Sequence, residues 1–326
     1  MTIEIKDNFP EIERLRISVN DVCNLNCLYC HRDGQLTRRN IRMIPKEREG
    51  ILIELVEYGI HEAKVAAMEP LLNKDTPNFL KFLKTIGIPR TSLTTNGTHI
   101  LNQGKKLEDS QVDEISISLD TLDNSTFEYL NQGNSQDLKN TLNGLIYLKN
   151  STIPEINLNM TLTKANLGDL EKMVNFSSEM GFDLRVIPLI TLMGQPSSIQ
   201  PNLDELKKIR GYFNTLQRIT PEDGKRKAYI DYRAGDIKVT LIDALCPNCE
   251  TCGKDYALRL TSDGKLKPCL VSENGEIDIL TPYRKCNMEE FYEKVQNAIL
   301  FKKKGLMKYF IPDSKSFNGG FIPQEN

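Results

Sequence analysis

The sequence lacks the features that mark membrane, secreted and nucleic-acid-binding proteins. No apolar run approaches the length of a membrane span, and the first residues, MTIEIKDNFPEIE, are acidic and have no signal-peptide core. The formal net charge is only −2, so it gives no reason to expect nucleic acid or an anionic membrane as a partner. These absences predict a soluble, cytoplasmic protein that binds neither.

Cysteine is missing from a long central part of the chain. None of the eight cysteines lies between Cys30 and Cys246. A secreted disulfide scaffold would be small and would spread its bridges, whereas clustered cysteines in a reducing compartment indicate metal sites. The eight form two candidate metal groups, one of Cys23, Cys27 and Cys30 and one of Cys246, Cys249, Cys252, Cys269 and Cys286.

The first group lies in the stretch RLRISVNDVCNLNCLYC, from Arg14 to Cys30. A β-like run leads into a CxxxCxxC spacing, whose three thiolates can converge on one soft metal centre. Neither a disulfide nor a closed zinc site uses three thiolates, whereas a four-iron, four-sulfur cluster held by three leaves one iron open for a ligand that is not protein. A redox-buffering Cys cluster and half of a zinc site are the competing interpretations.

From this Cys loop onward, apolar β-like runs alternate with segments of helical period. Repeated βα units predict an α/β fold of parallel strands and crossover helices, packed into an open or partial barrel. We expect strands over Leu15 to Val19, Ala63 to Ala67, Ser92 to Thr95, Glu114 to Leu119, Ile156 to Leu162 and Leu184 to Pro188. We expect helices over Pro45 to Tyr58, Thr76 to Ile86, Leu138 to Leu148, Leu167 to Met180 and Leu203 to Leu216.

The alternation stops near Ile219. A chain of 326 residues, 39% of them hydrophobic, can bury one large core and a small appended one. We therefore predict a barrel over residues 1–218 and a small C-terminal domain over residues 219–326.

Four of the expected strands lead into polar or cysteine residues at their carboxyl ends, where barrel folds place their active sites, and the sixth strand carries Arg185. Each residue has an ordinary explanation on its own, since Asn96-Gly97 is a common turn and Asp120 can cap a helix. Their shared placement favours one site rim, made of the Cys loop, Glu69, Thr95, Asn96, Ser118, Asp120 and Arg185.

The second Cys group is followed by a predicted hairpin. The piece ALRLTSDGKLKPCL is typical of two strands turned at Ser262 to Gly264, where Asp263-Gly264 suits positive φ. This hairpin brings Cys269 back beside the earlier cysteines. Four Cys can close a tetrahedral zinc site, and sets of three or four can hold a second iron-sulfur cluster. Spacing alone leaves both metals open.

The Cys loop resembles that of the radical S-adenosylmethionine (radical SAM) superfamily, in which an aromatic residue, here Tyr29, precedes the third Cys. The resemblance implies that the cluster on Cys23, Cys27 and Cys30 is catalytic. Its open iron chelates S-adenosylmethionine, and an electron cleaves this cofactor to a 5′-deoxyadenosyl radical. The protein's task is to position and orient the cofactor and substrate and to exclude competing reactions. The chemistry also implies an electron donor such as a flavodoxin or ferredoxin; a homodimer is left open.

Residues 12 to about 300 show a closer resemblance. The Cys loop, the βα units and a C-terminal CxxC followed by DGKLxPC resemble the GTP 3′,8-cyclase of molybdenum-cofactor biosynthesis, the MoaA family. That family has an auxiliary four-iron cluster with three Cys ligands, matched by Cys249, Cys252 and Cys269, whose open iron binds the guanine; Cys246 and Cys286 are additional. The resemblance implies cofactor contacts at Tyr29, Glu69 and Ser118, to which the rim adds Asn96 and Arg185, and nucleotide contacts at Arg16, Lys64, Thr95 and Arg259.

Several positions depart from the MoaA pattern. The family's GGEP reads Ala67-Met68-Glu69-Pro70, although glycine suits close approach of the backbone to the cofactor. Lys64 replaces an arginine, which keeps the charge and loses the planar fork. Ala257 and Asn157 replace two further cations, which argues against tight binding of a triphosphate. The family ends in a free Gly-Gly, whereas Gly319-Gly320 is followed by FIPQEN and is expected to be a surface turn.

Three functions remain open. The first is a lyase that rearranges a nucleotide, as GTP 3′,8-cyclase does. The second is a radical SAM dehydrogenase or small-molecule modifier with a fully ligated auxiliary cluster, which the additional Cys246 and Cys286 favour. The third is a non-catalytic scaffold with a zinc knot, which Ala67-Met68 favours. A peptide-modifying enzyme is not expected, because only 22 residues precede Cys23 and leave no room for a leader-peptide-binding domain.

Overall fold

A computed structural model of the chain describes residues 11–32, 42–189, 196–220, 229–242, 257–268 and 275–303. These residues contain one sheet with the strand order β12-β11-β10-β1-β2-β3-β4-β5-β6-β9-β8-β7. Neighbours from β1 to β6 pair in parallel, as repeated βα units predict. The first six strands are β1 (Arg14–Ile17), β2 (Glu62–Val65), β3 (Arg90–Thr95), β4 (Glu114–Ser118), β5 (Glu155–Leu162) and β6 (Asp183–Pro188).

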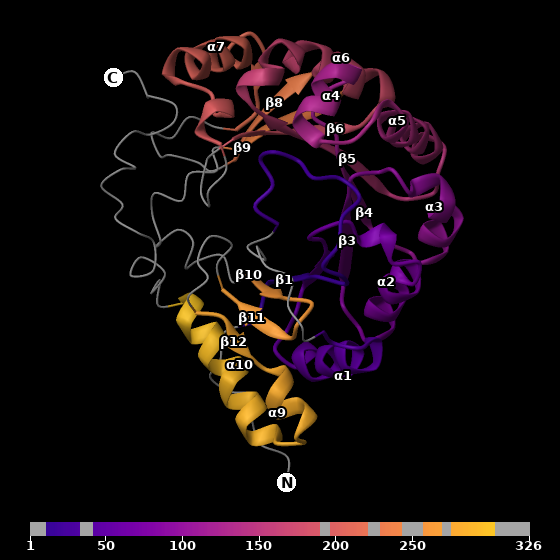
Figure 1. The fold of residues 1–326 in the computed structure, drawn as a ribbon, viewed down its shortest axis with the longest axis vertical. Helices are drawn as coiled ribbons and strands as arrows, with labels where there is room; N and C mark the ends of the chain where they lie inside the picture. Colours follow the sequence, from indigo (N-terminus) through magenta and orange to yellow (C-terminus); the bar gives the residue numbers. More distant parts are fainter. Residues whose placement is uncertain are drawn as a thin grey trace.

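Helices cover the outer side of this curved sheet (Figure 1). Alternate strand residues such as Leu15, Ile17 and Val65 are fully buried, because they form the core between the sheet and the helices. The helices are α1 (Pro45–Val56), α2 (Thr76–Thr85), α3 (Ile100–Asp109), α4 (Asn124–Asn131), α5 (Ser135–Lys149), α6 (Leu170–Met180) and α7 (Leu203–Phe213), with 3₁₀ turns η2 (Pro70–Leu72), η3 (Lys164–Asp169) and η4 (Ser197–Ile199).

Side-chain contacts show that the opposite face of the sheet is concave. Lys64 on β2 and Arg185 on β6 both reach Glu114 on β4, with N···O distances of 3.8 and 2.8 Å. Strands on either side of β4 can share one carboxylate only if the sheet curls towards that face. The chain is therefore a partial barrel with a polar inner face, and the Cys loop lies inside the arc (Figure 1).

The C-terminal third of the chain extends both edges of the barrel. Strand β10 pairs in parallel with β1, and β9 pairs in parallel with β6. Hairpin β10–β11 turns at Gly264 with φ of 76°, as its Asp-Gly sequence predicts. The division into domains at residue 218 stays a prediction. The remaining elements are β7 (Gln217–Arg218), β8 (Tyr229–Ala234), β9 (Ile237–Ile242), β10 (Ala257–Leu260), β11 (Lys265–Lys267), β12 (Ile277–Asp278), α9 (Leu280–Arg284) and α10 (Met288–Lys303).

All six predicted barrel strands are present, each with slightly different bounds. Helices α3, α4, α9 and α10 were not predicted. Segments such as NSTFEYLN of α4 are short and have few apolar residues, so they show little helical periodicity. The predicted end of α7 at Leu216 was wrong. The helix ends at Phe213, because Asn214 caps it and Gln217–Arg218 then pair with β8.

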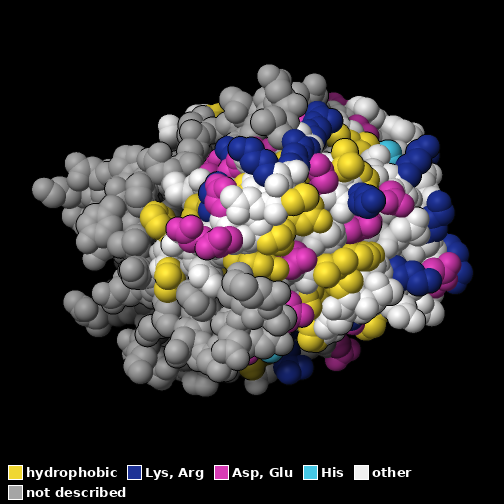
Figure 2. All heavy atoms as spheres, turned by 90° about the horizontal axis from the view of Figure 1, so that it is seen from below, with side chains coloured by type: hydrophobic (Ala, Val, Ile, Leu, Met, Phe, Trp, Pro, Cys, Tyr) yellow, Lys and Arg dark blue, Asp and Glu magenta, His cyan; other side chains and the backbone are white. Residues whose placement is uncertain are grey.

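The surface carries both signs of charge. Figure 2 shows Lys and Arg side chains interspersed with Asp and Glu on the face seen from below. Such mixing agrees with the small net charge of the sequence. In the described part of the chain, every helix is too short or too polar to span a membrane.

Candidate functional site

The Cys loop is held against the end of helix α4. The backbone N–H groups of Asn26 and Leu28 donate to the carbonyls of Asn131 and Leu130, over 3.2 and 2.8 Å. The last carbonyls of a helix have no partner within the helix, so they are available to a docking segment. The C-cap residue Gln132 has the left-handed conformation, with φ of 52°, and the loop docks on the last carbonyls of the helix, so α4 positions the cysteines.

Each of the three thiols of the loop accepts a nearby hydrogen bond. The N–H of Leu25 lies 3.4 Å from Cys23 Sγ, and that of Arg32 lies 3.2 Å from Cys30 Sγ. The side-chain amide of Asn131 lies 3.4 Å from Cys27 Sγ. Burial raises the pKa of Cys23 to about 11 and that of Cys27 to about 12. At neutral pH these thiols therefore keep their protons until a metal binds, which stabilises the thiolate and displaces the proton to solvent.

The donor set of the loop fits an iron-sulfur cluster. It offers three soft sulfur ligands, each with a neighbouring N–H group directed at the sulfur, which is how proteins stabilise cluster thiolates. Among the described residues, no group of three or more His, Cys, Asp and Glu side chains meets at a single-ion site. A four-iron cluster takes each thiolate on a different iron, so its ligands need not meet at one point.

Glu69 organises the rim beside the Cys loop. Its buried carboxylate accepts hydrogen bonds from the Thr95 hydroxyl and the Asn96 N–H, both at 2.7 Å, and from the Leu71 N–H at 2.9 Å. Burial raises the pKa of Glu69, and these three donors oppose the shift. The predicted rim residues on strands two and three are thus brought together, with Thr95 and Asn96 oriented by Glu69.

The turn before Glu69 keeps a glycine-type backbone without glycine. Ala67 has φ of 76° and Met68 has φ of 53°, in the left-handed region that L residues adopt at a cost. The turn is tied to the Cys loop, because the Glu69 N–H donates to the Val22 carbonyl over 3.0 Å. The departure from GGEP therefore adds two side chains to a turn whose backbone still has the positive φ that glycine favours.

Asp120 and Tyr29 join the Cys loop to strand β4. The Tyr29 hydroxyl donates to the buried Asp120 carboxylate, which also accepts from the Asn131 amide at 2.9 Å and the Thr161 N–H at 2.7 Å. Burial and the neighbouring carboxylate raise the pKa of Tyr29, so this phenol stays protonated. Asn131 was not predicted, and only a prediction of helix α4 would have placed it at the loop.

Ser118 ends strand β4 two residues before Asp120, and it is half-buried. It lies beside Asn159 of β5 in the sheet register. A cofactor contact at Ser118 stays a prediction, as do those at Tyr29, Glu69 and Asn96.

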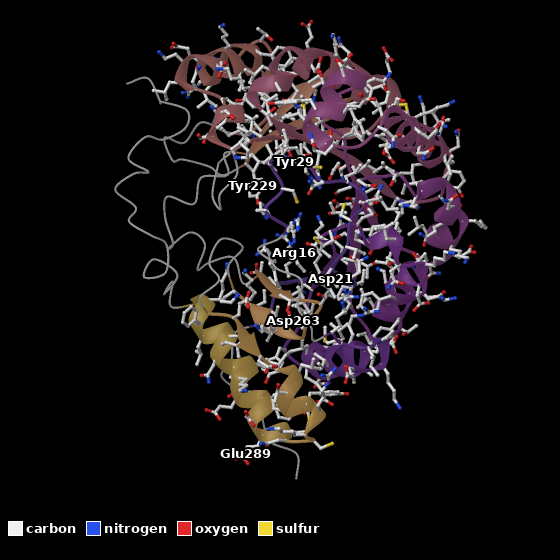
Figure 3. All side chains as sticks on the ribbon, in the orientation of Figure 1. Arg16, Asp21, Tyr29, Tyr229, Asp263 and Glu289 are labelled. Carbon is white, nitrogen blue, oxygen red and sulfur yellow. The ribbon has the colours of Figure 1, made fainter. Side chains whose placement is uncertain are left out.

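Three of the predicted nucleotide contacts lie in one row across neighbouring strands. The register of the sheet places Arg16 beside Arg259 of β10 on one side and beside Lys64 of β2 on the other. Figure 3 shows Arg16 in the space that the curved sheet encloses. We call Arg259, Arg16 and Lys64 the cation row. Thr95, the fourth predicted contact, lies at the rim with Glu69.

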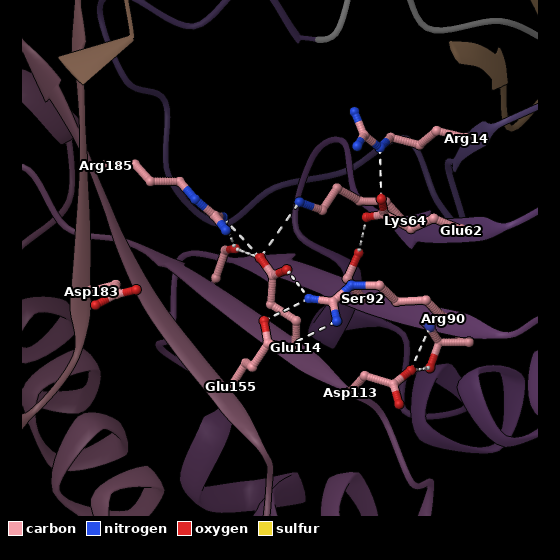
Figure 4. Close-up of polar contacts among 12 residues, drawn as sticks. Arg14, Glu62, Lys64, Arg90, Ser92, Asp113, Glu114, Glu155, Asp183 and Arg185 are labelled. Carbon is pink, nitrogen blue, oxygen red and sulfur yellow. Dashed lines mark hydrogen bonds and ion pairs between the residues drawn. The ribbon is translucent and has the colours of Figure 1, made fainter. Parts of the chain in front are cut away.

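Below the rim, Glu114 at the start of β4 collects cations from three other strands (Figure 4). It pairs with Arg185 and Arg90 at 2.8 Å and lies 3.8 Å from Lys64. Despite burial, these cations lower the pKa of Glu114 to about 2. Burial lowers the pKa of Lys64 to about 8, although Glu114 opposes the shift. Arg185 was expected at the rim and instead lies in this ionic floor, formed by Glu114, Lys64, Arg90 and Arg185.

The second Cys group falls mostly outside the described residues. Cys246, Cys249, Cys252 and Cys269 lie outside them, so an auxiliary cluster and its ligands stay a prediction. Cys286 is described, follows α9, and is an exposed free thiol with φ of 53°.

Comparison with known proteins gives three findings. The model of the Radical SAM superfamily matches residues 17–177. A protein named probable GTP 3′,8-cyclase from Methanococcus aeolicus is 31% identical over 286 residues, 84% of this chain and 90% of the relative. Its counterpart in Methanocaldococcus jannaschii is 31% identical over 294 residues, 88% of this chain and 95% of the relative.

The chain belongs to the radical SAM superfamily, as a MoaA-like member. Among solved structures, Streptococcus suis SuiB bound to S-adenosylmethionine superposes with a TM-score of 0.65 at 18% identity, covering 96% of this chain and 71% of SuiB. The structure of anSMEcpe with bound AdoMet and a peptide superposes with a TM-score of 0.61 at 17% identity, covering 93% of this chain and 83% of anSMEcpe. These two likenesses support the radical SAM partial barrel. The protein is a radical SAM enzyme, a superfamily that holds a four-iron cluster and uses S-adenosylmethionine.

Proposed function

We propose that this radical SAM enzyme is a lyase that rearranges a nucleotide, with GTP 3′,8-cyclase chemistry. The observation that carries the proposal is the cation row, because Arg259, Arg16 and Lys64 stand side by side on the concave face below the Cys loop. Adjacent cations are what a phosphate chain needs. Two relatives named probable GTP 3′,8-cyclase add support over more than four fifths of the chain.

In this proposal, Cys23, Cys27 and Cys30 hold the cluster, and the rim of Glu69, Asn96 and Ser118 holds the cofactor. S-adenosylmethionine bound there would supply the radical chemistry: one electron from the reduced cluster would cleave it to methionine and the 5′-deoxyadenosyl radical that abstracts hydrogen from the substrate. The cation row binds the phosphates and turns the sugar towards the Cys loop. Tyr29 and Asp120 close the loop side of the cavity and restrict water. The Cys residues that follow strand β9 hold an auxiliary cluster, and Arg185 supports the floor.

A second candidate rests on the ionic floor. Glu114 already engages Lys64 and Arg185, so part of the positive charge is neutralised before any substrate arrives. A radical SAM dehydrogenase or another small-molecule modifier would need fewer cations than a triphosphate needs. This candidate predicts a less charged substrate.

The deciding experiment measures 5′-deoxyadenosine release by the reconstituted, reduced protein with S-adenosylmethionine, with and without GTP and a panel of other nucleotides. We expect GTP to stimulate release, and Arg259→Ala to reduce the stimulated rate roughly 10- to 100-fold, the loss of one charge-assisted contact to phosphate. Arg233→Ala is the control, because Arg233 is an exposed cation on strand β8.

Two other outcomes would reject the proposal. Release that ignores every nucleotide, in the parent protein and in Arg259→Ala, would favour the second candidate. Absence of release in a protein that holds its cluster would favour a non-catalytic scaffold.

A further inference from the structure

Asn131 lies outside the Cys motif and contacts both the Cys-loop side and the strand β4 side of the cluster site. It ends helix α4 and is buried, with 5% of its surface exposed. Its main-chain carbonyl accepts the N–H of Asn26, and its side-chain amide reaches Cys27, Tyr29 and Asp120. One side chain thus joins a ligand-bearing loop to strand β4.

The groups around this side chain determine the orientation of its amide. Asn131 Nδ2 has two protons and three atoms within reach: Asp120 Oδ2 at 2.9 Å, the Tyr29 hydroxyl oxygen at 3.3 Å and Cys27 Sγ at 3.4 Å. Because the Tyr29 hydroxyl donates its own proton to Asp120, the second amide proton is directed to the side of Cys27 and Tyr29. Reversal of the amide would place its oxygen against both a sulfur and a carboxylate, which is unfavourable. The Oδ1 atom is buried and has no hydrogen-bond partner in the described part of the chain. The amide therefore keeps both donors in use and leaves its acceptor unsatisfied.

Asp120 provides the opposite electrostatic influence at the same place. It is 1% exposed and holds Tyr29, Asn131 and the Thr161 N–H around its carboxylate. Burial raises the pKa of Asp120, and the hydrogen bonds from these three groups oppose the shift. In its ionised form, this carboxylate disfavours the addition of an electron to a cluster on Cys27. A hydrogen-bond donor directed at Cys27 Sγ favours the addition of the electron. Hydrogen bonds to the sulfurs and the local net charge both set the reduction potential of a cluster.

We propose that Asn131 is a positioning residue that raises the reduction potential of the cluster held by Cys27 and offsets the charge of Asp120. The proposal rests on the cluster at Cys23, Cys27 and Cys30 and is independent of whether the substrate is GTP. The pair sets how strong an electron donor must be to reduce the enzyme. Asn131 acts through Cys27 and touches neither cofactor nor substrate.

The test is an EPR-monitored redox titration of the full-length, reconstituted protein. Asn131→Leu keeps the size of the side chain and removes both donors, so we expect the midpoint potential to become more negative. Asp120→Asn keeps the shape and removes a charge, so we expect a shift in the opposite direction. Gln132→Leu is the control, since Gln132 is the next residue and donates to the Tyr129 carbonyl at 2.7 Å.

Opposite shifts distinguish this role from a structural one, because a loosened loop would move both variants in the same direction. If Asn131→Leu loads no cluster, Asn131→Ser replaces it, since its shorter side chain reaches neither partner. An unchanged potential in the Asn131 variants, or shifts of one sign, would overturn the proposal. A parent protein without a four-iron signal would overturn the assigned cluster as well, and a normal signal with no response to GTP would count against the substrate alone.

Discussion

The rim and the ionic floor belong to the same barrel, but different interactions hold them together. The rim lies at the carboxyl ends of the strands and is built from hydrogen bonds to main-chain and side-chain groups, such as those that Glu69 accepts from Leu71 and Thr95. The floor lies nearer the amino ends and is built from ion pairs between separate strands, as in Glu114 with Arg90 and Arg185. Rim contacts orient donors towards a ligand, whereas floor contacts fix the curvature of the sheet. The two regions should therefore respond differently to substitution.

The largest expected effect is on the floor. Glu114→Gln removes the carboxylate that Lys64, Arg90 and Arg185 share, and it should lower the free energy of unfolding by about 3 kcal/mol. The cluster should still load, because the Cys loop does not contact Glu114. Urea unfolding and iron content measure the two effects. Loss of the cluster at unchanged stability would mean that the comparison between rim and floor is wrong.

Acid provides a second measurement on the same variant. The pKa of Glu114 is lowered to about 2, so its stabilisation is complete above about pH 4.5, the ordinary Glu value, and is lost as the pH falls from there towards 2. Glu114→Gln should lack this part of the acid dependence. An identical acid profile in both proteins would show that the carboxylate is not held by its cations.

An intermediate effect is expected where the floor meets the cation row. The pKa of Lys64 is lowered to about 8, so the side chain loses its charge as the pH rises through 8. Under the proposed function, nucleotide binding should weaken roughly tenfold between pH 7 and 9, the value of one charged contact. The Lys64→Arg protein should bind the nucleotide with the same affinity at pH 7 and pH 9, because arginine stays protonated. Equal pH dependence in the two proteins would remove Lys64 from the binding site.

The smallest effect belongs to the rim, at the turn that carries Ala67 and Met68. Ala67→Gly and Met68→Gly should each stabilise the protein by about 0.5 to 1 kcal/mol, because relief of the left-handed strain exceeds the added entropy of the unfolded chain. Ala66→Gly is the matched control. Ala66 has negative φ and is buried, so replacing it with glycine should lower the free energy of unfolding by about 1 kcal/mol. The melting temperatures of the three variants test this prediction. Destabilisation in all three would show that the turn is not strained.

The sequence predicted the rim better than the floor for a physical reason. Cys23, Cys27 and Cys30 act through fixed spacing, and Glu69, Thr95 and Asn96 follow strand ends, where a barrel brings residues together. The floor depends on how far each strand is displaced along its neighbour, which a strand assignment does not provide. Arg185 was expected at the rim for this reason, and Glu114 was overlooked as a partner for Lys64.

Helix α4 shows another limit of the sequence argument. Its segment NSTFEYLN has few apolar residues, so periodicity did not reveal it, and Asn131 was missed with it. The row of Arg259, Arg16 and Lys64 shows the reverse case. Each residue was identified through the family resemblance, and the parallel pairing of β10 with β1 then placed them side by side.

The pairing of β1 with β10 has a consequence for folding. The strand that leads into the Cys loop begins at Arg14, and its partner begins at Ala257, so the first βα unit leaves the ribosome long before that partner exists. Contacts with such large sequence separation form late and slow the overall folding rate. We expect the nascent chain to expose one edge of β1 until Ala257–Leu260 have been synthesised and have paired with it.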